Sequence, residues 1–72
     1  MGYTKKATDI VYAFIKDKIE KNEWRSGDRI YTEARLREEL GVSRVAVRQA
    51  ISRLESASVL YSIQGSGTYV QD

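Results

Sequence analysis

The stretch that decides the fold is GVSRVAVRQAISRLE, residues 41–55. At about 100° per residue, its apolar side chains gather on one side of a helix that is expected to run over Arg44 to Ala57. These core-facing residues are Val47, Ala50, Ile51 and Leu54. The stretch carries three arginines and has no acid before Glu55. Such a one-sided charge distribution indicates an anionic partner for this helix.

The opposite side of the same helix is free of acids. It consists of Val45, Gln49, Ser52 and Ser56, with Arg44 and Arg48 along its edge. Guanine offers O6 and N7 to a bidentate Arg, adenine offers N6 and N7 to Gln, and the thymine methyl accepts an apolar side chain. This face therefore predicts a helix that enters the major groove of DNA by its first turns. A solvated face remains an alternative, because Arg is a good helix former.

A second short helix is predicted just before this stretch. Thr32 can cap a helix over Glu33 to Leu40, in which Leu36 faces inward, and Gly41 is the expected C-terminal stop. Ser43 can then cap the next helix. Two short helices joined by a Gly-containing turn of three residues form a helix-turn-helix, here at about residues 33–57.

The flanking segments complete the expected order of elements. An apolar stripe with a four-residue spacing predicts an amphipathic helix from about Thr8 to Glu23, with Asn22 as a left-handed stop. A short strand is expected at Arg29 to Tyr31. The C-terminal part contains two β-rich runs, Val59–Ile63 and Thr68–Gln71, on either side of Gln64-Gly65-Ser66-Gly67. These runs predict a hairpin.

The order of elements defines the fold class. It is mainly α with a small β-hairpin, a three-helix winged helix-turn-helix in which the hairpin at about residues 59–71 is the wing. At 72 residues the chain is expected to form a single domain, 1–72, with a small core.

Composition excludes several classes of protein. The chain has no His and no Cys, so it lacks the usual general base and thiolate ligands, and we expect no enzyme, no metal site and no cofactor. It has no apolar run long enough for a membrane span and no signal peptide, which favours the cytoplasm. Residues 1–53 hold all 12 Lys and Arg against 8 acids, whereas residues 54–72 hold two acids and no base.

The motifs together resemble the DNA-binding domain of the GntR (gluconate repressor) family of bacterial transcription regulators. The resemblance covers about residues 8–71. Its most specific parts are "GVSR" at 41–44, "VR.A...L" at 47–54 and the wing ending "G.GT.V" at 65–70. The wing "VLYSIQGSGTYV" is most similar to that of the arabinose-operon repressors of Gram-positive bacteria.

The resemblance implies a function and a set of contacts. It implies a homodimer that binds a short inverted-repeat DNA operator. Arg44, Arg48 and Val45 would contact the DNA in the major groove, and Gln64 and Gly65 at the wing tip would contact it in the minor groove. The full set of candidate DNA-contacting residues is Lys6, Thr32, Glu33, Arg35, Ser43, Arg44, Val45, Arg48, Gln49, Gln64, Gly65 and Ser66.

Several of these positions keep a purely structural alternative. Glu33 suits the positive end of a helix dipole as well as an approach to DNA. Gly65 suits hairpin geometry as well as close approach to a groove. Lys5 and Lys6 suit phosphate contact as well as a frayed terminus. Arg53 lies on the flank of its helix, where a structural ion pair with a nearby acid is expected.

The sequence also departs from the family pattern. Tyr31 and Ser26 replace the usual prolines, and Asn22 and Ser58 replace the usual glycines. Ala34 stands where many members carry a DNA-contacting Arg or Asn, so Arg35 is an open candidate. Family members also carry a C-terminal domain that binds a small-molecule effector, and this domain is expected to be absent here. Two other functions stay open, namely a winged-helix module that binds protein and a domain that binds nucleic acid without sequence preference.

Overall fold

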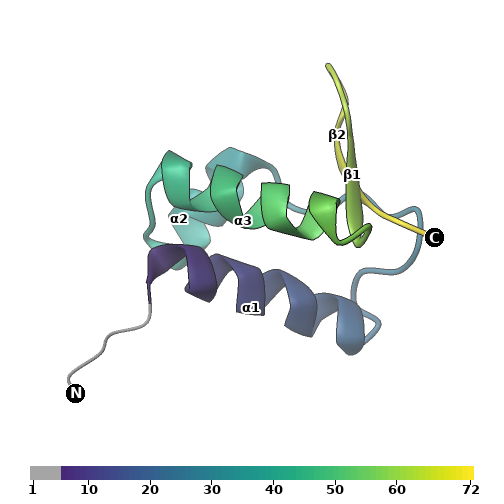
Figure 1. The fold of residues 1–72 in the computed structure, drawn as a ribbon, viewed down its shortest axis with the longest axis horizontal. Helices are drawn as coiled ribbons and strands as arrows, with labels where there is room; N and C mark the ends of the chain where they lie inside the picture. The colour runs from purple at the N-terminus through teal and green to yellow at the C-terminus, as the bar shows by residue number, and fades with distance from the viewer. Residues whose placement is uncertain (1–5) are drawn as a thin grey trace.

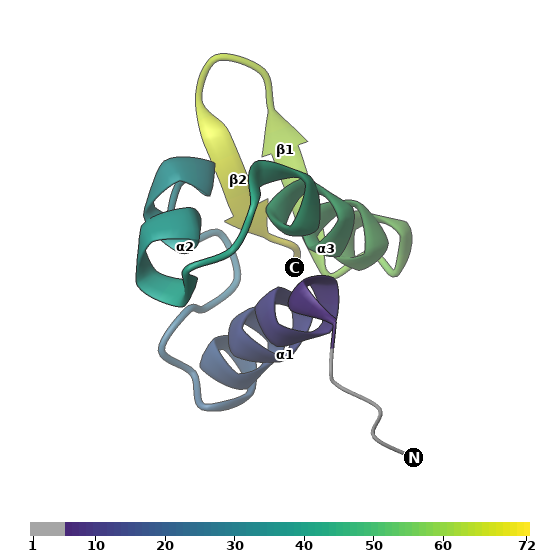
Figure 2. The ribbon, with the colours of Figure 1, turned by 90° about the vertical axis from the view of Figure 1, so that its left-hand side faces the viewer.

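A computed structural model describes residues 6–72. Over these residues, three helices are followed by an antiparallel hairpin. The elements are α1 (Ala7–Glu20), α2 (Glu33–Leu40), α3 (Arg44–Ser56), β1 (Leu60–Ile63) and β2 (Gly67–Val70). The helices lie together and the hairpin projects from the end of α3 (Figure 1), while the view turned by 90° shows the three helices around a common centre (Figure 2). The predicted winged helix-turn-helix is confirmed.

The core collects one apolar face from every element. The predicted stripe of α3 is buried, and Ala46 is buried beside it. Leu36 of α2 has no exposed surface, and Leu40 is half-buried. The buried residues of the core cluster are Val11, Ile15, Trp24, Ile30, Leu36, Val47, Ala50, Ile51, Leu54, Leu60 and Val70. The core therefore fixes α3 between α1, α2 and the base of the hairpin.

The first helix ends earlier than its predicted limit. It stops at Glu20 rather than Glu23, because Asn22 takes the left-handed conformation with φ 61°. The backbone N–H groups of Glu23 and Trp24 then bond to the carbonyl of Lys18. The Lys18 ammonium also donates to the Glu23 carboxylate at 2.8 Å, which raises the pKa of Lys18. The role predicted for Asn22 as the stop is thus confirmed, and the predicted helix end was wrong.

The caps that define the helix-turn-helix are confirmed. The Thr32 hydroxyl accepts from the backbone N–H of Arg35 at 3.1 Å, and the Ser43 hydroxyl accepts from that of Ala46 at 3.2 Å. Gly41 closes α2 in the left-handed conformation with φ 64°. Because each helix end is satisfied locally, the turn between α2 and α3 is set by its own sequence.

The strand predicted at Arg29 to Tyr31 does not form as a strand. It is reduced to one bridge between Arg29 and Tyr69, flanked by a hydrogen bond from the Ile30 N–H to the Thr68 carbonyl and one from the Val70 N–H to the Asp28 carbonyl. The segment is too short for a longer ladder, because a turn precedes it and α2 follows directly after it. The segment nevertheless holds the outer edge of β2.

The hairpin differs slightly from its predicted limits. Val59 and Gln71 lie outside the strands, whereas Gly67 belongs to β2 and pairs with Ile63. The loop therefore contains the three residues 64–66 rather than four. Ser58, between α3 and β1, has φ 61°.

Candidate nucleic-acid interface

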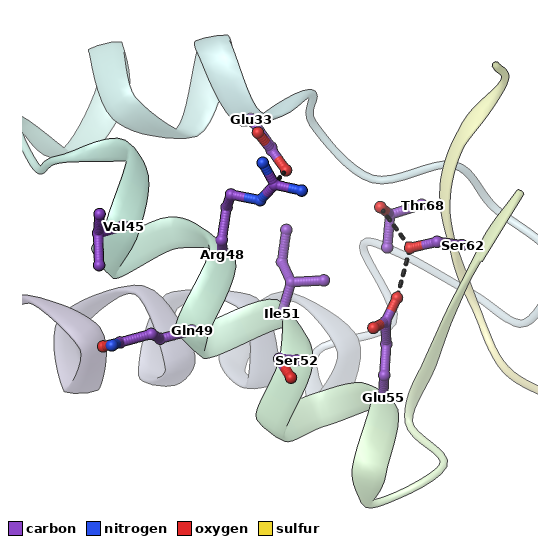
Figure 3. Close-up of a pocket in the computed structure, with 9 residues that line it drawn as sticks. All are labelled: Glu33, Val45, Arg48, Gln49, Ile51, Ser52, Glu55, Ser62 and Thr68. Carbon is purple, nitrogen blue, oxygen red and sulfur yellow. Dashed lines mark hydrogen bonds and ion pairs between the residues drawn. The ribbon is translucent and has the colours of Figure 1, made fainter. Parts of the chain in front are cut away.

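The outward side of α3 presents the predicted residues together. Val45 is 63% exposed, and Gln49 and Ser52 are exposed on the same side of the helix. Figure 3 shows Val45 and Gln49 extending from α3, while Arg48 extends toward Glu33. Among residues 6–72, no acid lies within ion-pair distance of Arg44, which is also exposed. The first turns of α3 thus carry an uncompensated positive charge beside an apolar contact surface.

Arg48 is held toward the start of α2. Its Nε lies 3.6 Å from a carboxylate oxygen of Glu33, as drawn in Figure 3. The two side chains are 64% and 43% exposed, so the pair is worth at most about 1 kcal/mol. An ion pair this weak can be exchanged for another anion. Glu33 also lies in the first turn of α2, so it meets both the helix dipole and Arg48.

A groove of about 510 Å³ separates α3 from the hairpin. It is lined by Glu33, Val45, Arg48, Gln49, Ile51, Ser52, Glu55, Ser62 and Thr68 (Figure 3). At its far end the Ser62 hydroxyl donates to the Glu55 carboxylate, and Ser62 and Thr68 share a hydrogen bond of 3.2 Å. This chain ties the end of α3 to both strands. Sequence reasoning did not assign it, although Ser62 and Thr68 stand opposite each other in the hairpin register.

The wing tip is exposed at Gln64, Gly65 and Ser66. Gly65 has φ 80°, and the Ser66 N–H closes the turn on the Ile63 carbonyl at 2.9 Å. The Ser66 and Tyr69 hydroxyls form a hydrogen bond with each other. Gly65 therefore has the structural role named as its alternative, because the hairpin loop needs a residue with positive φ at this position.

Arg29 supports the wing tip from below. Its guanidinium donates to the Ser66 carbonyl at 3.3 Å, across 37 residues of sequence. A Cβ on Gly67 would lie 2.9 Å from Cδ of Arg29, so this glycine leaves the space that the arginine fills. Sequence reasoning missed this role, because nothing near Arg29 in the chain points to residue 66.

The start of α1 lies beside the outward side of α3. The Thr8 hydroxyl donates to the Oε1 of Gln49 at 2.9 Å, and Arg53 pairs with Asp9 at 3.2 Å, which confirms the ion pair predicted for Arg53. Lys6 is the exposed N-cap residue of α1, whereas Lys5 lies outside the described residues. A hollow of about 490 Å³ between the two helices is lined by Lys6, Thr8, Asp9, Gln49, Ser52 and Arg53.

Three further candidates contact their own helix or the residues next to it. Thr32 and Ser43 use their hydroxyls as caps. The Arg35 guanidinium lies 3.9 Å from the centre of the Tyr31 ring and 3.6 Å from Glu39. Arg35 does not line the groove between α3 and the hairpin.

The described part of the chain offers neither a metal site nor a helix that could span a membrane. Residues 6–72 contain no cluster of acidic or other metal-ligating side chains that could hold a metal ion. Within the same range, no helix combines the length and apolarity that crossing a membrane requires.

Residues 7–70 match the family described as bacterial regulatory proteins, gntR family. The chain belongs to the GntR family. This is a family of regulatory proteins rather than of enzymes. Among curated GntR-type relatives, the chain is 50% identical over 58 residues to the mannosyl-D-glycerate transport/metabolism system repressor MngR of Escherichia coli K12, covering 81% of this chain and 24% of that protein. It is 38% identical over 58 residues to the histidine utilization repressor of Klebsiella aerogenes, with the same coverage.

Solved GntR-type structures agree with the fold. The DNA-binding domain of AraR in complex with operator ORR3 superposes with a TM-score of 0.91 at 35% identity, over 94% of this chain and 82% of that one. The same domain with operator ORE1 gives a TM-score of 0.91 at 34% identity, over 97% and 85% of the two chains. These matches support the resemblance noted in the wing. The chain spans about a quarter of the length of the curated relatives it matches.

Proposed function

We propose that this GntR-family chain is the sequence-specific DNA-binding domain of a bacterial transcription repressor. It binds a short inverted-repeat operator as a homodimer, with α3 in the major groove and the wing tip in the minor groove. The observation that carries this proposal is the outward side of α3, where exposed Val45 and two arginines stand on a helix without acids before Glu55.

The chemistry of this side fits the edges of DNA bases and the backbone. Arg44 has no protein acid to neutralise it among residues 6–72, so it is suited to a phosphate or to guanine O6 and N7. Arg48 can exchange its weak pair with Glu33 for the same ligands. Val45 offers an apolar surface to a thymine methyl. The capped N-terminus of α3 adds the positive end of a helix dipole.

The wing extends the proposed interface. Gln64 and Gly65 stand at an exposed tip, with the Arg29 guanidinium directly behind the loop. A narrow tip with a positive charge behind it suits the minor groove, whose floor offers hydrogen-bond acceptors. Two structures of the AraR DNA-binding domain in complex with operators give operator binding by this fold a precedent at about a third identity.

The remaining features of the whole protein follow the relatives. Residues 1–72 form one winged helix-turn-helix domain, with the helix-turn-helix at about 33–57 and the wing at about 59–71. The relatives are about four times longer than the matched region, which leaves room for a domain that binds a small-molecule effector. A repressor of this kind acts in the cytoplasm, and α3 and the wing need no cofactor to bind DNA.

A titration of labelled duplexes, followed by fluorescence anisotropy, tests the proposal. One pool contains random inverted repeats and the other contains shuffled controls, each at about 50 and 200 mM salt, a range over which phosphate contacts weaken steeply. The expected result is selective binding to a palindromic subset, with two chains per duplex.

Two other outcomes would contradict the proposal. Equal binding to all duplexes would reduce the chain to a non-specific basic domain. Absence of binding at the lower salt concentration would replace it with the protein-binding module, because a phosphate-anchored domain must bind there.

A further inference from the structure

The side-chain amide of Gln49 is oriented by the first helix. The Thr8 hydroxyl donates to the Oε1 of Gln49 at 2.9 Å, across 41 residues of sequence. Gln49 is exposed on the outward side of α3, where Figure 3 shows its amide at the edge nearest α1. The amide therefore does not rotate freely, since its oxygen is turned toward α1.

The charges around this amide favour the same orientation. Gln49 lines the hollow at the start of α1 together with two cations, Lys6 and Arg53, and one acid, Asp9. The remaining positive charge attracts the oxygen end of the amide dipole. Asp9 and Arg53 also pair at 3.2 Å, which clamps the first turn of α1 against α3 and fixes the position of Thr8.

The consequence concerns which base edge Gln49 can meet. Bidentate recognition of adenine needs the amide oxygen for N6 and the amide nitrogen for N7. With the oxygen bound to Thr8, the side chain offers the two N–H donors of Nε2 to the groove. Guanine, with O6 and N7, and thymine, with O4, present polar groups that are all acceptors, whereas adenine places the N6 donor beside its N7 acceptor and cytosine presents the N4 donor.

We infer that Thr8 is a positioning residue that makes Gln49 a donor-only reader, specific for a keto base, guanine or thymine, in the operator. The inference rests on the proposed function, because it assigns one base position within the same complex. Thr8 acts only through Gln49 and is not itself placed in contact with DNA. Its hydrogen bond is exposed, so its loss should alter specificity far more than stability.

The test is a selection from a random half-site library of duplexes at low salt, carried out with the wild-type chain and with Gln49→Ala. The base position whose preference disappears in Gln49→Ala is the one that Gln49 reads. Every base pair contains one keto and one amino base, so the selected pair is then tested with base analogues: removal of the keto oxygen should weaken wild-type binding by at least about fivefold, the lower limit for a side chain that reads a base, whereas removal of the adenine N6 or cytosine N4 amino group should not.

Variants of Thr8 then separate positioning from simple packing. Thr8→Val keeps the shape and removes the hydroxyl, so the Gln49 amide can turn its oxygen toward an amino group, and the preference for the keto oxygen should fall by about fivefold or more. Thr8→Ser keeps the hydroxyl and should retain the wild-type preference, while Thr8→Ala should behave like Thr8→Val. Unfolding temperatures of all variants should stay close to that of the wild type.

The outcomes distinguish the two proposals. If the wild type selects no motif, the proposed function fails and the inference fails with it. If the wild type selects a motif but Gln49→Ala changes no position, or binding depends on the amino group of the selected pair and not on its keto oxygen, only the inference is overturned. It is also overturned if Thr8→Val and Thr8→Ala keep the full preference for the keto base.

Discussion

Helix α3 and the wing line the same groove, yet different interactions hold them in place. Five residues of α3 are buried, namely Ala46, Val47, Ala50, Ile51 and Leu54. In the hairpin, burial is confined to Leu60 and Val70 at its base, and residues 61–66 are all exposed. The core thus positions α3, whereas polar contacts from Glu55, Ser62 and Arg29 position the wing.

This difference separates two kinds of substitution. A change under α3 acts on the fold and on binding together, because the helix cannot shift without opening the core. A change in the polar contacts of the wing acts on binding with little effect on the fold, since exposed hydrogen bonds contribute little to stability. The four predictions below test this separation, from the largest expected effect to the smallest.

Leu54→Ala removes a fully buried side chain from beneath α3. It should destabilise the chain by about 2–5 kcal/mol, a large part of the stability of so small a domain. Urea unfolding followed by circular dichroism measures the loss. Ser52→Ala, two positions earlier and exposed, is the matched control and should stay within about 0.5 kcal/mol. Equal effects of the two substitutions would show that the core does not position α3.

Arg48→Ala should weaken operator binding by about 1–3 kcal/mol if Arg48 reads a base by a bidentate contact. Stability should hardly change, because the pair with Glu33 is exposed. Anisotropy titration on the selected duplex measures the effect. Arg37→Ala removes the same charge from the exposed surface of α2 and serves as the control. Equal losses in both variants would reduce Arg48 to a general electrostatic role.

Ser62→Ala removes the hydrogen bond from the wing to Glu55 of α3 and the bond to Thr68 within the wing. We expect DNA affinity to fall by a factor corresponding to about 1 kcal/mol, as the wing loses its fixed angle to α3, with a smaller change in unfolding temperature. Ser56→Ala, at an exposed position of α3, should have no effect on either quantity. Unchanged affinity of Ser62→Ala would remove this contact from the account of how the wing is positioned.

Ser58→Gly relieves a left-handed residue at the joint between α3 and β1, where φ is 61°. Glycine avoids the Cβ clash at the cost of a more flexible unfolded chain, so a net gain of about 0.5 kcal/mol is expected. Thermal unfolding should show a slightly higher midpoint. Asn22→Gly should gain less, because Asn tolerates this conformation better than Ser. A lower midpoint for Ser58→Gly would indicate that the serine makes the joint more rigid.

Features with a local physical cause could be predicted from the sequence. The apolar spacing in residues 44–57 predicted which side of α3 is buried, and Thr32, Ser43 and Gly41 predicted the helix ends, because caps act within a few residues. The same reasoning predicted Asn22 as the end of α1. It placed the C-terminal end of that helix three residues too late, since the spacing of apolar residues does not show where the chain leaves the helical conformation.

Contacts between distant segments could not be predicted in this way. The bonds from Thr8 to Gln49 and from Arg29 to Ser66 join residues 41 and 37 positions apart, and no periodicity relates them. The pairing of Glu33 with Arg48 depends on the angle between α2 and α3. The short segment at Arg29 satisfies its backbone through β2 rather than as a strand of its own, which β propensity alone cannot distinguish.

The pair between Arg48 and Glu33 also affects how many small ions take part in the proposed complex. An arginine that neutralises a phosphate releases condensed cations, and each such contact adds about 0.9 to the slope of log affinity against log salt. Arg44, with no acidic partner among residues 6–72, should contribute that full increment. Arg48 exchanges its pair with Glu33 for the DNA contact, and the Glu33 carboxylate that remains nearby offsets part of the charge that Arg48 brings to the DNA. The contact of Arg48 with DNA is therefore expected to depend less on ionic strength than the contact of Arg44.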